Sequence, residues 1–165
     1  MKKNLAIVLM VFVIFGVIAC GEPDRVLTDE EAFFVKVNES KELLNTVADD
    51  IYSYWYVAIY EDEYLGNINY AIEQVQSDNG KNIETIKSND KRIDDIYKKV
   101  KEGDLSNEIE EVIRAYKDYY EFVINVSGSF VSYSESRGTK KKQLESALSN
   151  LKYKLREIKK HANLD

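Results

Sequence analysis

Apolar residues recur with a helical period along most of the chain, and charged residues fill the positions between them. The stripes run over residues 37–58, 65–100, 109–130 and 144–158, with the 3.6-residue spacing of amphipathic helices. No alternating run is bounded by hairpin turn residues, so the sequence does not favour strands. We therefore predict an all-α fold: an antiparallel bundle of three long helices, with the third kinked or split into a fourth.

A capping signal marks the start of the first helix. Thr28 is followed three residues later by Glu31, which is the spacing of a capping box. The acidic residues in this first turn also suit the positive end of the helix dipole. We expect the first helix to run from Asp29 to about Asp62.

Glycines mark the places where the helices should break. We favour a turn at Gly66-Asn67, although the seven-residue phase continues through it and one continuous helix is the alternative. A kink is expected at residues 78–80, next to Gly80. The second helix should end at residues 101–103, where lysine precedes glycine, and Ser106 should cap the third.

The last third of the chain allows two arrangements. Ser127-Gly128-Ser129 interrupts the third stripe, and a serine-rich run over 132–136 leads to Gly138. The final stripe is either a fourth helix or the far half of one long, kinked helix, which we favour. Gly128 itself has two interpretations. We favour that it permits close helix packing or a kink; the alternative is that it opens the bundle and exposes backbone groups to a ligand.

The N-terminal segment differs from the rest of the chain. Lys2 and Lys3 precede an uncharged apolar run over residues 5–19, which is shorter than the ~20 residues that cross a bilayer. The run ends at Val17-Ile18-Ala19-Cys20, which contains the only cysteine. This segment resembles the signal peptide and lipobox of bacterial lipoprotein precursors, in which aliphatic and small residues precede a cysteine.

The resemblance implies cleavage after Ala19 and acylation of Cys20. Residues 1–19 would be the signal peptide, 20–27 the lipidated cysteine with a short tether, and 28–165 the helical bundle. Two or three acyl chains anchor a protein stably where one is marginal. The expected location is the extracytoplasmic face of a bacterial cell membrane, with membrane lipid as a partner. The alternative is an ordinary signal peptide or an uncleaved anchor.

The charge of the chain bears on its partners. The formal net charge is −6, and loss of Lys2 and Lys3 would make it −8. We expect no nucleic-acid binding, because that depends on neutralising phosphates. From Arg137 onward, however, the chain contains nine basic residues and only three acidic ones. We favour packing of this basic segment against acidic neighbours; contact with an anionic envelope surface is the alternative.

The sequence offers little for catalysis or metal binding. His161 is the only histidine, so no zinc cluster, di-iron bundle site or hydrolase triad can be assembled. No glycine-rich phosphate loop is present. The acidic groups at 49–50, 61–63 and 94–95 suit solvated faces, since adjacent helical residues point about 100° apart. We expect no enzymatic activity, no cofactor and no metal site.

Tyrosine is the compositional feature that suggests a contact surface. The chain has twelve, and several of those in the first helix are spaced four apart on one face. The candidate surface consists of Tyr52, Tyr56, Tyr60, Tyr64 and Tyr119. We favour their being boundary residues with buried rings and wet hydroxyls; an aromatic binding surface for an envelope protein, peptide or glycan is the functional alternative.

These observations favour a membrane-anchored extracytoplasmic lipoprotein whose helical bundle is a binding module. A structural envelope spacer without a specific site is one alternative. A lipoprotein of exclusion or immunity at the cell surface is another.

Overall fold

The fold is entirely helical over the residues that the computed structural model describes, which are 26–61 and 63–162. The elements are α1 (Asp29–Tyr60), the 3-10 helix η1 (Glu63–Gly66), α2 (Ile68–Asp78), α3 (Gly80–Val100), α4 (Ser106–Ile124) and α5 (Phe130–Ala162). The predicted all-α class is thus confirmed. Cys20, the predicted signal peptide and most of the predicted tether lie outside the described residues.

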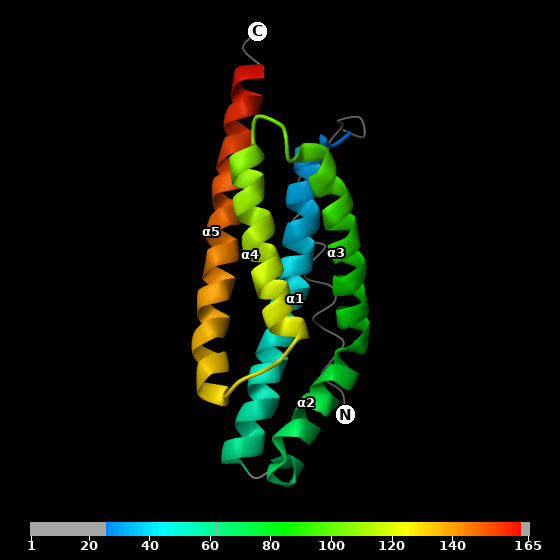
Figure 1. The fold of residues 1–165 in the computed structure, drawn as a ribbon, viewed down its shortest axis with the longest axis vertical. Helices are drawn as coiled ribbons and strands as arrows, with labels where there is room; N and C mark the ends of the chain where they lie inside the picture. Colours follow the sequence, from blue (N-terminus) through cyan, green and yellow to red (C-terminus); the bar gives the residue numbers. More distant parts are fainter. Residues whose placement is uncertain (1–25, 62, 163–165) are drawn as a thin grey trace, which may run out of the picture.

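Consecutive long elements run antiparallel (Figure 1). α1 runs the length of the bundle, α2 and α3 return as one bent element, α4 descends and α5 ascends. α1 contacts each of the other helices, and α5 packs on both α4 and α1. The third predicted helix is therefore split into two antiparallel helices and is not a single kinked one.

The first helix begins at the predicted capping box. The Glu31 N–H donates to the Thr28 hydroxyl at 3.3 Å, and the Thr28 N–H donates to the Glu31 carboxylate at 3.1 Å. These bonds satisfy donors that the first helical turn cannot pair internally. α1 then ends at Tyr60, two residues before the expected Asp62.

The predicted turn at Gly66-Asn67 and the predicted break near Gly80 are both present. Asn67 caps α2, since its side-chain oxygen accepts from the Tyr70 N–H at 3.1 Å. α2 and α3 meet at Asn79, a buried residue whose amide donates to Asp50 at 3.0 Å.

One boundary prediction was wrong, and the helix does not break at Gly138, where the sequence left the question open. Ser106 is the first residue of α4 and makes no capping bond, because the N-cap position falls on Leu105. Gly138 and the serine-rich run before it are helical, within α5. Burial of Tyr133 and Leu144 on either side of Gly138 holds this segment against the bundle.

The core contains the predicted seven-residue stripe. Its α1 and α3 members are Val37, Leu44, Ile51, Ala58, Ile86, Ile93 and Val100, all buried. Tyrosine hydroxyls reach α1 from two other helices: Tyr119 of α4 donates to Asn45 at 3.0 Å, and Tyr133 of α5 donates to the Ala48 carbonyl at 3.3 Å. These directional bonds fix how α4 and α5 sit along α1.

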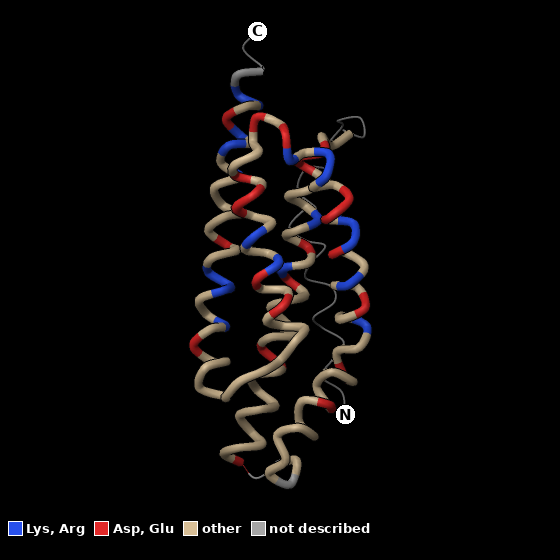
Figure 2. The backbone as a smooth tube through the Cα atoms, in the orientation of Figure 1, with Lys and Arg blue, Asp and Glu red and all other residues tan. Residues whose placement is uncertain are grey.

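Lys and Arg are absent from one end of the bundle, where the charged residues are the acidic ones at positions 61–63, between α1 and α2 (Figure 2). Residues 51–60, 64–72 and 122–134 contain no Lys, Arg, Asp or Glu. We call this the distal end, since it lies at the opposite end of α1 from Asp29. Among the described helices, none is long and apolar enough to cross a membrane.

Candidate functional site

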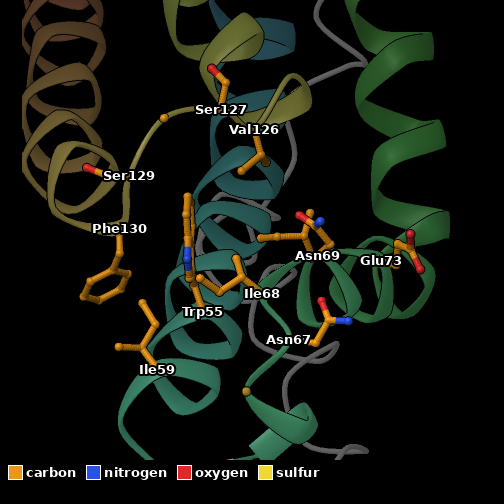
Figure 3. Close-up of a pocket in the computed structure, with 13 residues that line it drawn as sticks. Trp55, Ile59, Asn67, Ile68, Asn69, Glu73, Val126, Ser127, Ser129 and Phe130 are labelled. Atoms are coloured by element: carbon orange, nitrogen blue, oxygen red, sulfur yellow. The ribbon is translucent and has the colours of Figure 1, made fainter.

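A pocket of about 1060 Å³ opens at the distal end (Figure 3). Three separate parts of the chain form its walls: Trp55 and Ile59 of α1, residues 66–69 with Ile72 and Glu73 of α2, and residues 126–130. Apolar side chains alternate with amides and hydroxyls along these walls. The lining is thus half polar and half apolar, and the pocket is open to solvent.

Trp55 is the most unusual residue of the pocket. Its side chain is only 5% exposed, and its ring packs against Phe130 at 6.1 Å and Tyr133 at 5.6 Å between centroids. Over the described part of the chain, its Nε1 is the one buried side-chain polar atom without a hydrogen-bond partner. Figure 3 shows the indole between Phe130 and Ile68, with Asn69 across the pocket.

The missing hydrogen bond has an energetic consequence. Leaving a buried donor unpaired costs about 1–3 kcal/mol, and buried indole N–H groups usually find an acceptor. The core position of Trp55 agrees with the apolar stripe predicted over residues 37–58, within which it falls. The unpaired donor beside a pocket was not expected, because it depends on residues from α2 and α5.

The start of α2 brings more donors to the pocket. The first helical backbone bond of α2 runs from the Ala71 N–H to the Asn67 carbonyl, and the Asn67 side chain takes the Tyr70 N–H. The backbone N–H groups of Ile68 and Asn69 come before the first of these bonds, so they have no partner within the helix. Both residues line the pocket.

Gly128 lies in the wall formed by residues 126–130. Its φ of +93° favours glycine, and an added Cβ would approach the Ser132 hydroxyl to 2.9 Å. That hydroxyl, at the start of α5 and four residues along the chain, is the one neighbour within 4 Å, so Gly128 does not permit a close approach between helices distant in the sequence. Its positive φ lets the chain turn from α4 into α5 beside the pocket.

Three of the five candidate tyrosines gather around one phenylalanine. Phe130 stacks on Tyr52 at 5.1 Å and contacts Tyr56 at 6.2 Å and Tyr60 at 5.9 Å between centroids. Tyr56 and Tyr60 are 39% and 60% exposed, while Tyr52 is half-buried. We call Tyr52, Tyr56, Tyr60 and Phe130 the aromatic face; the sequence placed Phe130 at the end of the third apolar stripe and not with these tyrosines.

Tyr64 lies apart from the aromatic face. It has a positive φ of 54° in η1, and its ring stacks on Tyr54 at 5.4 Å and meets Tyr70 at 6.1 Å. The four-residue spacing predicted that Tyr52, Tyr56, Tyr60 and Tyr64 follow one another along one face of a helix. This arrangement ends at Tyr60, because α1 ends there.

Tyr119 was placed wrongly in the contact surface. Its side chain is 1% exposed, and its hydroxyl donates to Asn45. Burial raises the pKa of Tyr119 well above its ordinary value. Its side chain faces α1 within the core, where no partner can reach it.

Exposed apolar side chains concentrate at the distal end. The large ones there that expose at least a third of their area are Tyr56, Ile59, Tyr60, Ile68, Tyr70 and Val131. Single exposed apolar residues are common on soluble proteins, whereas a contiguous group of them marks an interaction site.

The charged residues form surface pairs away from the pocket. Arg137 bonds Asp49 at 3.0 Å, Lys140 bonds Asp118, and Lys159 pairs with Glu31. The basic last helix thus packs against acidic neighbours, as expected. Within 26–61 and 63–162, no group of three or more histidines, cysteines or carboxylates could hold a metal ion.

The sequence matches no protein-family model. Comparison with curated proteins and with solved structures likewise gives no significant match.

Proposed function

We propose that this protein is a lipid-anchored extracytoplasmic lipoprotein that binds a ligand at the distal end of its bundle. One observation carries the binding role: large apolar side chains, among them Tyr56, Ile59 and Tyr60, lie exposed around the distal pocket. The proposal includes no catalysis, since Glu73 is the one titratable side chain that lines the pocket.

The anchor and the pocket would lie at opposite ends of the molecule. The lipobox resemblance places the lipid on Cys20, and the seven residues before Thr28 reach at most roughly 25 Å. α1 has 32 residues and spans about 48 Å at ~1.5 Å per residue. The distal end would therefore face away from the membrane, toward the cell wall or the medium.

Fatty-acid labelling tests the anchor. Cys20→Ala should abolish incorporation of a labelled fatty acid and release the protein from the membrane fraction. Labelling that persists in this variant would refute the assignment of Cys20.

In-cell photo-crosslinking tests the binding role. A photoreactive residue at Tyr56 or Tyr60 should give a discrete adduct. The matched control is Tyr153, a tyrosine of α5 that is 57% exposed and outside the pocket. An adduct at the distal positions and none at Tyr153 supports a binding module. Adducts at none of the three positions, in an anchored and folded protein, would favour the envelope spacer.

A further inference from the structure

We infer that the distal pocket is the docking groove for one amphipathic helix of a partner protein, a helix that carries Lys or Arg beside its apolar residues. This inference rests on the proposed binding function and names its partner class. It follows from three features of the molecule: a helix position that α4 leaves empty beside α1, the composition of the pocket lining, and the acidic surroundings.

α4 covers only part of the length of α1. Its Tyr119 bonds Asn45 of α1, whereas α1 continues to Tyr60. α4 itself ends at Ile124, and residues 125–129 lead across to α5 (Figure 1). Among the described helices, α2 packs on α1 and α3 but on neither α4 nor α5. The position beside α1 that α4 fills nearer the start of α1 therefore holds no described helix at the distal end.

The distal pocket lies at this empty position. Its walls come from α1, from α2 and from the connection that follows α4 (Figure 3). Two isoleucines of these walls are exposed, Ile59 of α1 by 40% and Ile68 of α2 by 36%. An amphipathic helix binds such a groove through apolar side chains spaced three to four residues apart. A partner helix in this place would restore the four-helix arrangement of the rest of the bundle.

The lining suits a protein segment better than a small molecule. It is half polar and open to solvent. Small-molecule sites enclose most of the ligand in a largely apolar cleft, whereas protein interfaces are about as polar as the rest of the surface. Ile59, Ile68 and Ile72 would cover the apolar stripe of the partner helix, while Asn67 and Asn69 offer amides to the polar side chains at its edges.

The surroundings of the pocket favour a cationic partner. Residues 42–80 include eight acidic residues and no Lys or Arg, and residues 118–136 also lack both. Glu73 lines the pocket and Glu61 follows α1; both are exposed, and neither has an ion-pair partner among the described residues. The C-termini of α1 and α4 meet the N-termini of α2 and α5 here, so the helix dipoles oppose each other and the carboxylates determine the sign of the field.

The aromatic face already holds one guanidinium group. Arg137 lies over the Tyr52 ring, 4.1 Å from its centroid, while it bonds Asp49 at 3.0 Å. A ring and a carboxylate thus hold the same cation. Tyr56 and Tyr60 belong to the same face and are more exposed, and no described Lys or Arg lies over either ring. A Lys or Arg of the docked helix would occupy that place.

The same charges argue against other occupants. A second copy would bring an equally acidic distal end to a two-fold interface, where like charges would face each other. The basic end of α5 cannot reach the pocket of a neighbour in the same membrane, because it lies at the opposite end of the bundle (Figure 2). Nucleic acid, acidic glycans and anionic lipids would meet carboxylates without a Lys or Arg to pair with them.

Three synthetic peptides of about 14 residues, or roughly four helical turns, test the partner class. The basic helical peptide contains Leu and Lys with the apolar period of an amphipathic helix. In the acidic peptide Glu replaces Lys, and the scrambled peptide has the residues of the basic one in an order without helical period. Full-length protein in non-ionic detergent micelles is titrated with each peptide.

The emission of Trp55 reports binding. Trp55 lines the pocket and is the only tryptophan in the chain, and the peptides contain none, so a peptide that only enters the micelle leaves no signal of its own. We expect a saturable change with the basic helical peptide. The acidic and scrambled peptides should bind at least about tenfold more weakly.

Two pairs of matched variants locate the peptide. Glu73→Lys and Glu84→Lys change the net charge equally at exposed positions, but only Glu73 lines the pocket. Glu73→Lys should weaken binding of the basic helical peptide about tenfold and Glu84→Lys much less. Ile59→Ala and Ile158→Ala each shorten an exposed isoleucine, and only Ile59→Ala should weaken binding. Equal effects within either pair would overturn the placement of the helix.

The outcomes separate the partner class from the binding function. Equal binding of the three peptides, or no saturable change with the basic helical peptide, overturns the basic helix as partner. If the Tyr60 crosslink then still gives a discrete adduct, the binding function stands with a different partner. If the crosslinks fail as well, both proposals fall.

Discussion

The hydroxyls of Ser40 and Tyr116 lie 3.1 Å apart in the core, where both side chains are fully buried. This bond joins α1 to α4 across the centre of the bundle. Neither group has water as an alternative partner, so each depends on the other.

Ser40→Ala should therefore destabilise the bundle. The substitution leaves the Tyr116 hydroxyl buried without this partner, which costs about 1–3 kcal/mol in the free energy of unfolding. Urea unfolding at neutral pH measures the loss. Adding Tyr116→Phe to the same chain removes the orphaned hydroxyl and should restore part of the stability. A double variant less stable than Ser40→Ala would contradict this account.

The capping box makes a second prediction. Thr28→Ala removes the acceptor for the Glu31 N–H and should lower the free energy of unfolding by about 1 kcal/mol. Thr46→Ala is the control within the same helix, because Thr46 is exposed and its hydroxyl bonds only the Glu42 carbonyl. Thermal unfolding followed by circular dichroism should show a lower midpoint for Thr28→Ala alone.

Two glycines near each other in the sequence should respond oppositely to alanine. Gly128→Ala forces a Cβ onto a residue with φ of +93° and should destabilise the fold by about 1–2 kcal/mol. Gly138→Ala adds a methyl group in open space within α5 and should stabilise it by about 0.5–1 kcal/mol. Matched urea titrations check both signs, and equal effects would refute the difference between the two positions.

The buried tyrosines predict a loss of stability in alkali. Burial raises the pKa of Tyr116, Tyr119 and Tyr133 well above the ordinary tyrosine value near 10. Their native hydroxyls stay protonated at a pH where the unfolded chain ionises. Stability should be fully present below about pH 10 and fall above it, by up to about 1.4 kcal/mol per pH unit for each tyrosine.

Denaturant titrations between pH 7 and pH 11 test this pH dependence. Tyr133→Phe removes one of the three groups, so it should make the fall above pH 10 less steep. A stability that stays constant up to pH 11 would contradict the burial of these hydroxyls.

Local signals predicted most of the helices. The seven-residue stripe identified Val37, Leu44 and Ile93 as core, and short-range hydrogen bonds of the capping type confirmed the helix starts at Thr28 and Asn67. Such signals succeed because both partners lie within one turn of each other in the sequence.

The pocket and the fate of Tyr119 could not be predicted in this way. The burial of Tyr119 depends on its packing against α1, which is distant in the sequence, and the pocket requires α1, α2 and residues 126–130 to meet. Whether the third and fourth apolar stripes form one kinked helix or two separate helices also depends on contacts between residues far apart in the sequence. It depended on whether the chain after Asn125 would pack back along α4.

The lack of Lys and Arg at the distal end determines how a ligand would be captured there. Its acidic residues, at 61–63 and 73, cannot attract a neutral ligand from a distance, so association of such a ligand should proceed at the unsteered rate of about 10⁵–10⁶ M⁻¹s⁻¹. In return, dissolved ions have little to screen between this surface and a neutral ligand. A basic helix, in contrast, would be drawn in faster in dilute than in salty surroundings, so the medium outside the cell would set how quickly the protein finds its partner.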